Sequence, residues 1–315
     1  MPPVPLVRVI RSGVEESVHV GSVAVSDADG RLVASVGDPA RVAFARSSMK
    51  PLQASVSLRL AGDDLPDREV AVMCASHNGE PVHVDAVRSI LDRAGLGVDA
   101  LQTPPDRPID EASAVNVTEP RPEFHNCSGK HAGMLLASVR RGFDPSSYRD
   151  PAHPLQAEVG EAVTAAAGRA PAALGVDGCG VPVHALPLAA MAGVYARLAA
   201  GRVPGGERVL GAMRAEPYLV AGRDRVCTAV MEHAPVAVKT GAEGMMCAAV
   251  PARGIGVALK IDDGASRAAD PAMVRVLALL DLLDPSEVPA FARPAVLGGG
   301  RPVGELVAGF SLDPA

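Results

Sequence analysis

Lysine is scarce in this chain of 315 residues: among its thirty basic residues only four are lysine, and the others are arginine. Arginine keeps its proton in a protein, whereas a lysine that is desolvated or placed beside another cation can become a neutral base. Each remaining lysine is therefore either a chance survivor of a compositional bias or a candidate for chemistry. The four positions are Lys50, Lys130, Lys239 and Lys260.

Other scarcities exclude whole classes of protein. The net charge of −6 leaves no basic field for a nucleic-acid backbone or an anionic membrane surface. The longest stretch without a charged residue, 178–196, is interrupted by Pro182, His184 and Pro187 and is unsuited to spanning a membrane. Five cysteines are an odd number, and the first residues lack the basic and then apolar pattern of a signal peptide. We therefore expect a protein of the reducing cytoplasm.

The hydrophobic content, 48%, is enough for a sizeable core, and its pattern changes along the chain. Residues 4–45 alternate between apolar and polar, with a turn at Asp27–Gly30 that predicts an antiparallel hairpin. The segment 47–60 has helical spacing, and Pro51 suits only a first turn, so Ser47 is expected at a helix start. Further on, the pattern predicts helices at 81–94, 130–140, 153–168 and 185–200, strands from Pro235, and a helix near 266–283.

These patterns predict an α/β (α+β) fold, with an antiparallel sheet flanked by helices and a helical insertion. We expect residues 1–315 to form a single unit. Within it, 1–60 and 216–315 would form the sheet region, so that both ends of the chain share one sheet, and 61–215 would form a mainly helical region.

Three short motifs suggest acyl-transfer chemistry. Ser47-Ser48-Met49-Lys50 places a hydroxyl and an amine about one helical turn apart, Ser76-His77-Asn78 follows the strand-like segment VAVMCA, and Lys239-Thr240-Gly241 lies on a predicted strand. Ser-x-x-Lys, Ser-x-Asn and Lys-Thr-Gly occur in this order in the serine β-lactamases and penicillin-binding proteins, whose fold the predicted elements resemble. Taken singly, each triplet is equally compatible with a helix cap, a loop or a strand edge.

The chemistry explains why these residue types are needed together. Acyl transfer requires an activated hydroxyl, a base, a proton relay and donors for the developing oxyanion. Ser47 would attack, Lys50 would accept its proton, Ser76 would shuttle protons, and Lys239 would supply positive field. Asn78 and Thr240 are expected to contact the substrate.

Two glycine-rich loops each carry a cysteine: His125 to Gly133 contains Cys127, and Asp177 to Pro182 contains Cys179. Two thiolates from separate loops, with a lysine or histidine and a water, could complete a tetrahedral zinc site. Buried free cysteines are common, however, and spacing of this kind does not decide between the two alternatives.

The longer motifs ARSSMKPLQA, CASHNGE, FHNCSGKHAGML, DGCGVPVHALPL, VAVKTGAEG and ALKIDDGASRA together resemble the asparaginase II family, the rhizobial-type L-asparaginases, over nearly the whole chain. The resemblance implies a serine β-lactamase-like fold and hydrolysis of L-asparagine to L-aspartate and ammonia. It implies catalytic roles for Ser47, Lys50, Ser76 and Lys239, and substrate contacts from Arg46 and Asp177. It also implies a zinc site of Cys127, Lys130 and Cys179, and a homodimer.

We therefore expect an L-asparaginase that forms an acyl-enzyme on Ser47 and acts on a small molecule, without nucleic-acid or membrane partners. The nearest alternatives keep the fold and change the substrate to a β-lactam, a D-Ala-D-Ala peptide or glutamine. A catalytically silent zinc-binding protein is the alternative of a different class. All motif serines and lysines are present, which favours an enzyme.

Overall fold

The computed structural model describes residues 4–315, which form two compact units; residues 1–3 of the predicted sheet region lie outside this range. Unit 1 comprises the chain up to Ser48, Ala185–Ala200 and Ala229–Ala315, and unit 2 comprises Met49–His184 and Gly201–Thr228. The division differs from the predicted sheet and helical regions in two respects. Residues 49–60 and 216–228 belong to the helical unit, because the helix that starts at Lys50 packs among other helices. Residues 185–200 belong to unit 1, because their helix packs on the sheet.

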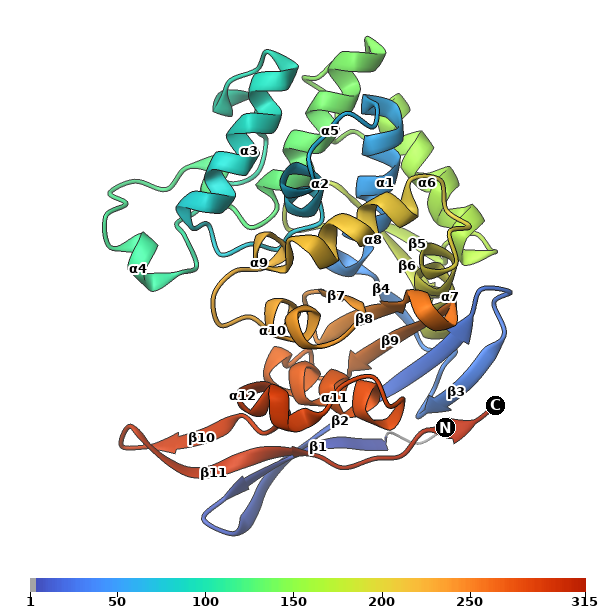
Figure 1. Ribbon diagram of the computed structural model, residues 1–315, viewed down its shortest axis with the longest axis vertical. Coiled ribbons are helices and arrows are strands. Elements are labelled where there is room, and N and C mark those ends of the chain that lie inside the picture. The colour runs from blue at the N-terminus through green and yellow to red at the C-terminus, as the bar shows by residue number, and fades with distance from the viewer. Residues whose placement is uncertain (1–3) are drawn as a thin grey trace. The chain divides into compact units, whose positions relative to one another are not determined.

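Unit 1 is built on one large antiparallel sheet, in which strands from both ends of the chain lie side by side (Figure 1). The main path runs β10-β11-β1-β2-β9-β8-β7, with β3 paired to β2 and β12 paired to β3. The strands are β1 Val4–Arg11, β2 Val14–Asp27, β3 Leu32–Val36, β7 Ala237–Thr240, β8 Met245–Val250, β9 Ile255–Ile261, β10 Ala295–Gly298, β11 Arg301–Ala308 and β12 Asp313–Pro314. The prediction that both chain ends share one sheet is confirmed by the pairing of β2 with β9 and of β1 with β11.

The predicted hairpin between β2 and β3 is also confirmed. The carboxylate of Asp27 accepts hydrogen bonds from the N–H groups of Asp29 and Arg31, at 2.9 Å each. Gly30 closes the turn with a backbone bond of 3.0 Å to the Asp27 carbonyl and a φ of 85°, a value that glycine adopts without strain. The turn residues named by the sequence therefore account for the geometry.

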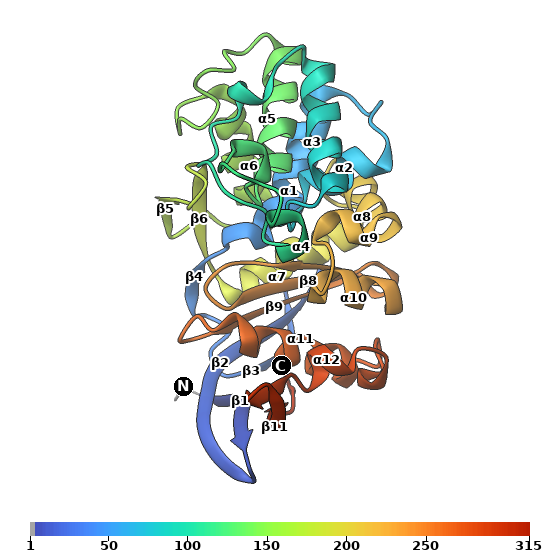
Figure 2. The same cartoon turned by 90° about the vertical axis from the view of Figure 1, so that its left-hand side faces the viewer.

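Two helices cover opposite faces of this sheet, α7 Leu188–Ala199 on one side and α11 Ser266–Leu279 on the other (Figure 2). The helix α7 approaches the backbone of β9 closely at Gly256, where an added Cβ would lie 2.1 Å from the Ala192 carbonyl oxygen. Only glycine fits there, so Gly256 sets how near α7 lies to the sheet. The sheet flanked by helices and the helical insertion confirm the predicted fold class.

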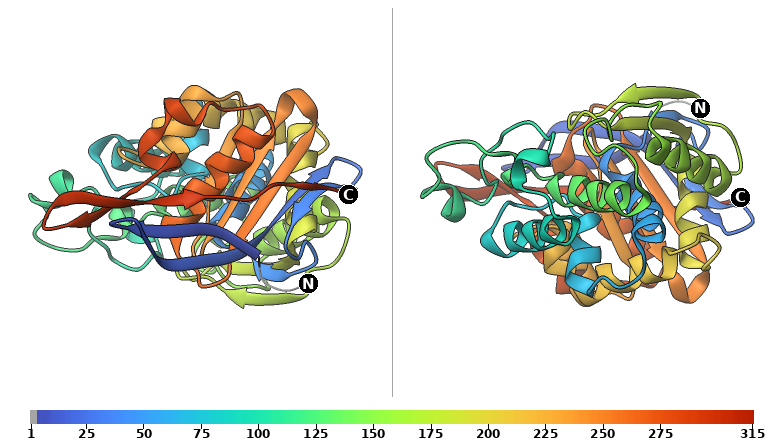
Figure 3. Two further views of the ribbon diagram at one scale, coloured as in Figure 1. Left: turned by 90° about the horizontal axis from the view of Figure 1, so that it is seen from below. Right: turned by 90° about the horizontal axis from the view of Figure 1, so that it is seen from above.

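Unit 2 is mainly helical. Its helices are α1 Lys50–Ala61, α2 Asp67–Met73, α3 Pro81–Ala94, α4 Glu111–Ala114, α5 Ser128–Arg141, α6 Pro154–Ala167, α8 Gly206–Ala215 and α9 Pro217–Val220. The right-hand view of Figure 3 shows α5 between α1 and α3, and it packs against both. An added Cβ at Gly129 would lie 2.1 Å from the Val72 carbonyl oxygen, so α5 begins in close contact with α2.

The remaining elements are short. The strands β4 Val42–Phe44, β5 Ala173–Val176 and β6 Pro182–Pro187 form a second sheet in the order β4-β6-β5. Two further helices are α10 Val226–His233 and α12 Pro289–Ala292. The 3₁₀ segments are η1 Arg46–Met49, η2 Val98–Ala100, η3 Pro122–Phe124, η4 Pro251–Arg253 and η5 Pro285–Glu287. In the described part of the chain, no helix combines the length and apolar character that crossing a bilayer requires.

Two predictions about local structure are wrong. The segment VAVMCA, expected as a strand, lies mostly in α2, which begins after Pro66 and carries Asp67 and Glu69 in its first turn. A short apolar run looks the same in a buried helix and a buried strand, and here packing against α5 and α8 decides for the helix. The helix expected at 185–200 begins only at Leu188, because Pro182–Pro187 forms β6.

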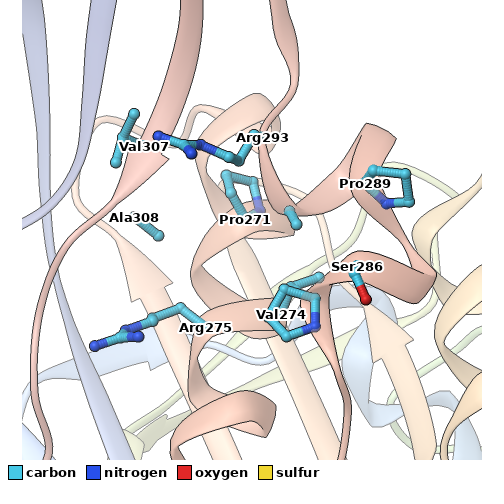
Figure 4. A pocket seen from close by; sticks show the side chains of 10 residues that line it. Pro271, Val274, Arg275, Ser286, Pro289, Arg293, Val307 and Ala308 are labelled. Carbon is cyan, nitrogen blue, oxygen red and sulfur yellow. The ribbon is translucent and has the colours of Figure 1, made fainter.

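Each unit contains a cavity that none of the predicted site residues lines. The cavity of unit 1, about 340 Å³, lies between α11, α12, η5 and β11 and has mostly apolar walls with two arginines (Figure 4). The cavity of unit 2, about 490 Å³, is lined by charged residues of both signs from α3, the segment 108–124 and Arg223. The predicted site residues therefore have to be located by their own contacts.

Candidate active site

The predicted site residues are divided between the two units. Unit 1 carries Arg46, Ser47, Lys239 and Thr240. Unit 2 carries Lys50, Ser76, Asn78, Cys127, Lys130, Asp177 and Cys179. Within each unit the structure brings residues that are distant in sequence into contact, and the two groups are described in turn.

In unit 1, Ser47 lies in the 3₁₀ turn η1, which directly precedes α1 as the sequence predicts. Ser47 is partly exposed, whereas the neighbouring Ser48 is 1% exposed. The Ser48 hydroxyl donates to the Ala45 carbonyl at 2.5 Å, and the Ser48 carbonyl accepts the hydroxyl of Tyr195. Of the two adjacent serines, Ser48 is therefore turned inward, which leaves Ser47 as the candidate nucleophile.

The Lys-Thr-Gly strand lies next to this turn. Lys239 on β7 is fully buried, and its amine donates to the Thr240 carbonyl at 2.7 Å. Across the ladder, Lys239 is paired with Cys247, whose pKa is raised by burial to about 12 although the neighbouring Ser48 acts to lower it. Gly241 lies so near the turn that an added Cβ would be 3.2 Å from the Ala45 carbonyl oxygen. Unit 1 thus brings the Ser47 turn and the second motif lysine together.

In unit 2, Lys50 and Ser76 are in direct contact. The Lys50 amine lies 3.0 Å from the Ser76 hydroxyl oxygen, 2.5 Å from the Ala75 carbonyl and 3.4 Å from the Asn126 carbonyl. Burial lowers the pKa of Lys50 below its ordinary value. A neutral amine has two hydrogens and one lone pair, so it can donate to both carbonyls and accept the Ser76 proton. The site therefore suits a lysine that acts as a base.

The loop after Ser76 is held by Asn78 and Glu80. The Asn78 amide nitrogen donates to Glu80 at 3.2 Å and to the Arg223 carbonyl at 2.9 Å, and its oxygen accepts from Arg225 at 2.7 Å. Glu80 also accepts the Arg223 N–H at 3.0 Å and the hydroxyl of Tyr218. Asn78 therefore cross-links this loop, and a direct contact with substrate would require it to exchange one of these bonds. Its substrate-binding role stays a prediction.

His77, which the sequence motifs do not single out, joins this loop to the start of α5. Its Nδ1 accepts the Gly79 N–H at 3.0 Å, and its Nε2 donates to the Ser128 hydroxyl at 2.9 Å. Ser128 in turn donates to the Glu123 carbonyl at 2.9 Å, so these partners define a neutral imidazole. Burial agrees, because it lowers the pKa of His77 well below its ordinary value. His77 therefore holds the loop to the start of α5 through these two hydrogen bonds, and it does not act as a proton carrier.

The two cysteine loops meet in unit 2. The Lys130 amine lies 3.0 Å from the Cys179 sulfur, and the Cys127 thiol donates to the side-chain oxygen of Asn126 at 3.0 Å. The two thiols lie close enough to act on each other: Cys179 lowers the pKa of Cys127, and Cys127 raises that of Cys179. Burial opposes the charged form of Lys130, but the two sulfurs raise its pKa overall.

The chemistry of these three donors fits a zinc ion. Two soft sulfur ligands and one amine nitrogen converge, and a tetrahedral ion would have a fourth position left for water. Within residues 4–315 no three histidine, cysteine or acidic side chains gather around a possible metal position. The third donor beside the two cysteines is a lysine, Lys130. Asp177 begins the tight turn that presents Cys179, closed by a bond of 2.8 Å from Gly180 N–H to the Asp177 carbonyl.

Comparison with known proteins gives a family and several distant structures. The family model for L-asparaginase II matches residues 7–308. No curated protein matches the chain. The structure of Mglu in its native form has 16% identity and a TM-score of 0.49, over 84% of this chain and 64% of Mglu. A Bacillus glutaminase has 12% identity and a TM-score of 0.47, over 84% of this chain and 91% of its own. A β-lactamase from Mycobacterium bovis has 16% identity and a TM-score of 0.36, over 82% and 94%.

The family match includes residues of both units and every predicted site residue. The serine β-lactamase-like class predicted from the motif order agrees with the antiparallel sheet, its flanking helices and the helical insertion. The predicted resemblance is confirmed: the chain belongs to the L-asparaginase II family.

Proposed function

We propose that this protein is an L-asparaginase, which hydrolyses the side-chain amide of L-asparagine to L-aspartate and ammonia. The observation that carries the proposal is the buried contact of Lys50 with Ser76, a base and a proton relay that acyl transfer requires. Membership of the family supports an amide of asparagine or glutamine as the substrate. The choice of asparagine is the finer part of the proposal.

In the proposed mechanism Ser47 attacks the amide carbon while its proton passes to Lys50. The new bond joins Ser47 Oγ to this carbon, and the carbonyl oxygen gains the negative charge that backbone N–H groups stabilise. The C–N bond then breaks, and a proton delivered through Ser76 leaves with ammonia. Water attacks the acyl-enzyme in the second step and releases aspartate, and the Ser47 oxygen regains its proton. Lys239 supplies positive charge without exchanging a proton.

Recognition of a free amino acid requires groups for an ammonium and a carboxylate. We assign these roles to Asp177 and Arg46, whose charges have the required signs, with Thr240 as a further hydrogen-bonding group. Neither a β-lactam nor the D-Ala-D-Ala end of a longer peptide carries a free ammonium and a free carboxylate on one carbon, as asparagine does. Glutamine has both charged groups and one additional methylene, so it is the closest competitor.

The substrate proposal is tested by measuring ammonia release from L-asparagine and L-glutamine, with hydrolysis of a chromogenic β-lactam measured alongside. We expect L-asparagine to have the highest kcat/KM. One methylene is worth about 10- to 200-fold in a fitted pocket, so glutamine should be slower by a factor in this range. A preference for glutamine or for the β-lactam would overturn the substrate choice. Zinc binding without turnover of any amide would support the catalytically silent alternative.

We further propose that Cys127, Lys130 and Cys179 hold one zinc ion. When bound, the ion would act as a Lewis acid or as a cross-link between the two loops. Both cysteines would bind as thiolates and Lys130 as a neutral amine, so binding releases protons and becomes weaker at low pH. The homodimer and the cytoplasmic location stay predictions; light scattering tests the former.

Removal of the metal ligands is expected to abolish zinc binding. Cys127→Ala with Cys179→Ala should reduce the zinc content from about one ion per chain to nearly none, measured by mass spectrometry of metals. Chelation of wild-type protein should lower its Tm, since a ligand at about 100 times its Kd stabilises by about 2.7 kcal/mol. Cys74→Ala is the matched control, because Cys74 is an equally buried thiol of the same unit outside the cluster. Wild-type protein that fails to bind zinc would contradict the proposal.

A further inference from the structure

The turn that carries Ser47 has an uncommon backbone conformation. Arg46, the residue before the proposed nucleophile, has a φ of 50°, in the left-handed region that residues with a side chain rarely adopt. Such a conformation persists only where surrounding contacts hold it. We therefore expect the turn to depend on contacts that neighbouring residues make on the side opposite the Ser47 side chain.

These contacts converge on Ser48. Its hydroxyl donates to the Ala45 carbonyl at 2.5 Å, its N–H donates to the same carbonyl at 3.2 Å, and its carbonyl accepts the Tyr195 hydroxyl. The Cys247 thiol lies beside Ser48, close enough for Ser48 to lower its pKa. The polar groups of Ser48 are thus turned into unit 1, and this fixes the direction in which the preceding residue, Ser47, is presented.

Tyr195 is itself rigidly placed. It is 2% exposed and lies on α7, the helix that approaches β9 at Gly256. An added Cβ at Gly256 would lie 2.7 Å from the Tyr195 Cβ, so the strand touches the helix at this residue. The position of the Tyr195 hydroxyl is therefore set by the packing of α7 on the sheet.

We propose that Tyr195 is a positioning residue for the nucleophile: its hydroxyl holds the Ser48 peptide so that Ser47 stays in the attacking orientation. The inference rests on the proposed function, since it assigns the role through Ser47. The effect of Tyr195 on the reaction is assigned to its hydrogen bond with the Ser48 carbonyl. Loss of the hydroxyl removes a buried hydrogen bond to this carbonyl, so the turn relaxes.

The test is Tyr195→Phe, which removes one oxygen and keeps the ring. We expect kcat on the better amide substrate to fall about 10- to 100-fold, because a misplacement of about 1 Å has effects of this size. KM should change little, since the binding groups remain. The matched control is Ser26→Ala, which removes another buried hydroxyl, one that donates to a carbonyl of α7, Ala189, at 3.0 Å. This control should lower Tm similarly and leave kcat unchanged.

A second readout separates this inference from the proposed function. The rate at which a sulfonyl fluoride modifies Ser47, located by peptide mass spectrometry, needs no amide substrate, and it should be slower in Tyr195→Phe. Wild-type protein that hydrolyses neither amide would overturn the proposed function, and the labelling rates would then test the positioning role. Equal labelling of wild type and variant, including none in either, contradicts the inference, as does an unchanged kcat.

If Tyr195→Phe does not fold, Cys247 provides another pair of variants. Cys247→Ala removes the thiol that contacts Ser48, and Cys247→Ser restores a hydrogen-bonding group at the same position. A kcat that falls in Cys247→Ala and recovers in Cys247→Ser supports the proposal that contacts to Ser48 position Ser47. Equal kcat in the two variants overturns it.

Discussion

Ser47→Ala is expected to lower ammonia release by about 10⁴-fold or more, because a nucleophile and its base act as a unit and the loss of either removes most of the catalysis. Ser47 is the partly exposed serine of the turn, and an alanine at this position breaks none of the hydrogen bonds that hold Ser48. The variant should therefore fold with an unchanged Tm. The measurement is kcat by ammonia release, with acid-quenched intact-mass spectrometry to detect an acyl-enzyme in the wild type.

Ser48→Ala distinguishes the two adjacent serines. The hydroxyl of Ser48 donates inward to the Ala45 carbonyl, so its loss should weaken the turn and lower kcat by about 10-fold, with the acyl-enzyme still formed. If Ser47→Ala keeps its activity, the nucleophile is Ser48 or Ser76. Loss of activity in Ser48→Ala alone would assign it to Ser48.

Lys50→Met is the second large effect we expect, a loss of about 10³-fold or more in kcat. Methionine preserves the volume but has no amine, so Ser47 loses its base and Ser76 loses its partner at 3.0 Å. Lys50→Arg should be almost as inactive, since arginine keeps its proton and cannot act as a base. Kinetics of both variants, with Tm as a check on folding, would decide between a base and a mere positive charge.

The chain offers a matched control in Lys260. It is partly buried on β9 and its amine also donates to a backbone carbonyl, that of Ile261, but it lies outside the three short motifs to which the proposed chemistry is assigned. Lys260→Met should leave kcat within about two-fold of the wild type, as surface changes away from special features usually do. Substantial activity in Lys50→Arg, or a loss in Lys260→Met equal to that in Lys50→Met, would contradict the assigned base.

The elements that follow from the sequence are those with local signals. The helix predicted at 81–94 is α3 Pro81–Ala94, since Pro81 suits its first turn and Gly95 ends it with a φ of 65°. The strands after Pro235 follow from their alternation and from β-branched residues. The patterns in the sequence do not predict β10 and β11: β11 pairs with β1 at the other end of the chain, and β10 pairs with β11. Such long-range pairing has no local signature.

The residues of the candidate site likewise fall into those with a local sequence signal and those without one. Lys50, Ser76 and the cysteine loops are evident because rare residue types stand in short motifs. The role of Tyr195 is not evident, because its partner, the Ser48 carbonyl, is far away in sequence. His77 stands inside a motif, but its link to the Ser128 hydroxyl is equally long-range and so has no local signal. The three tyrosines of the chain offer a weak signal, since a buried tyrosine generally requires a partner for its hydroxyl.

The sheet of unit 1 has a consequence for how the chain folds during synthesis. The strands β1 and β2 are made first, yet their partners β11 and β9 are made last. The helical unit is complete once residue 228 has been made. It can therefore fold before β9 and β11, the partners of β2 and β1, have been synthesised. Closing the sheet must then join the two ends of the chain, which is a slow step in proteins with long-range contacts. Until it happens, the unpaired edges of β1 and β2 are open to other chains, so refolding yield should fall as protein concentration rises.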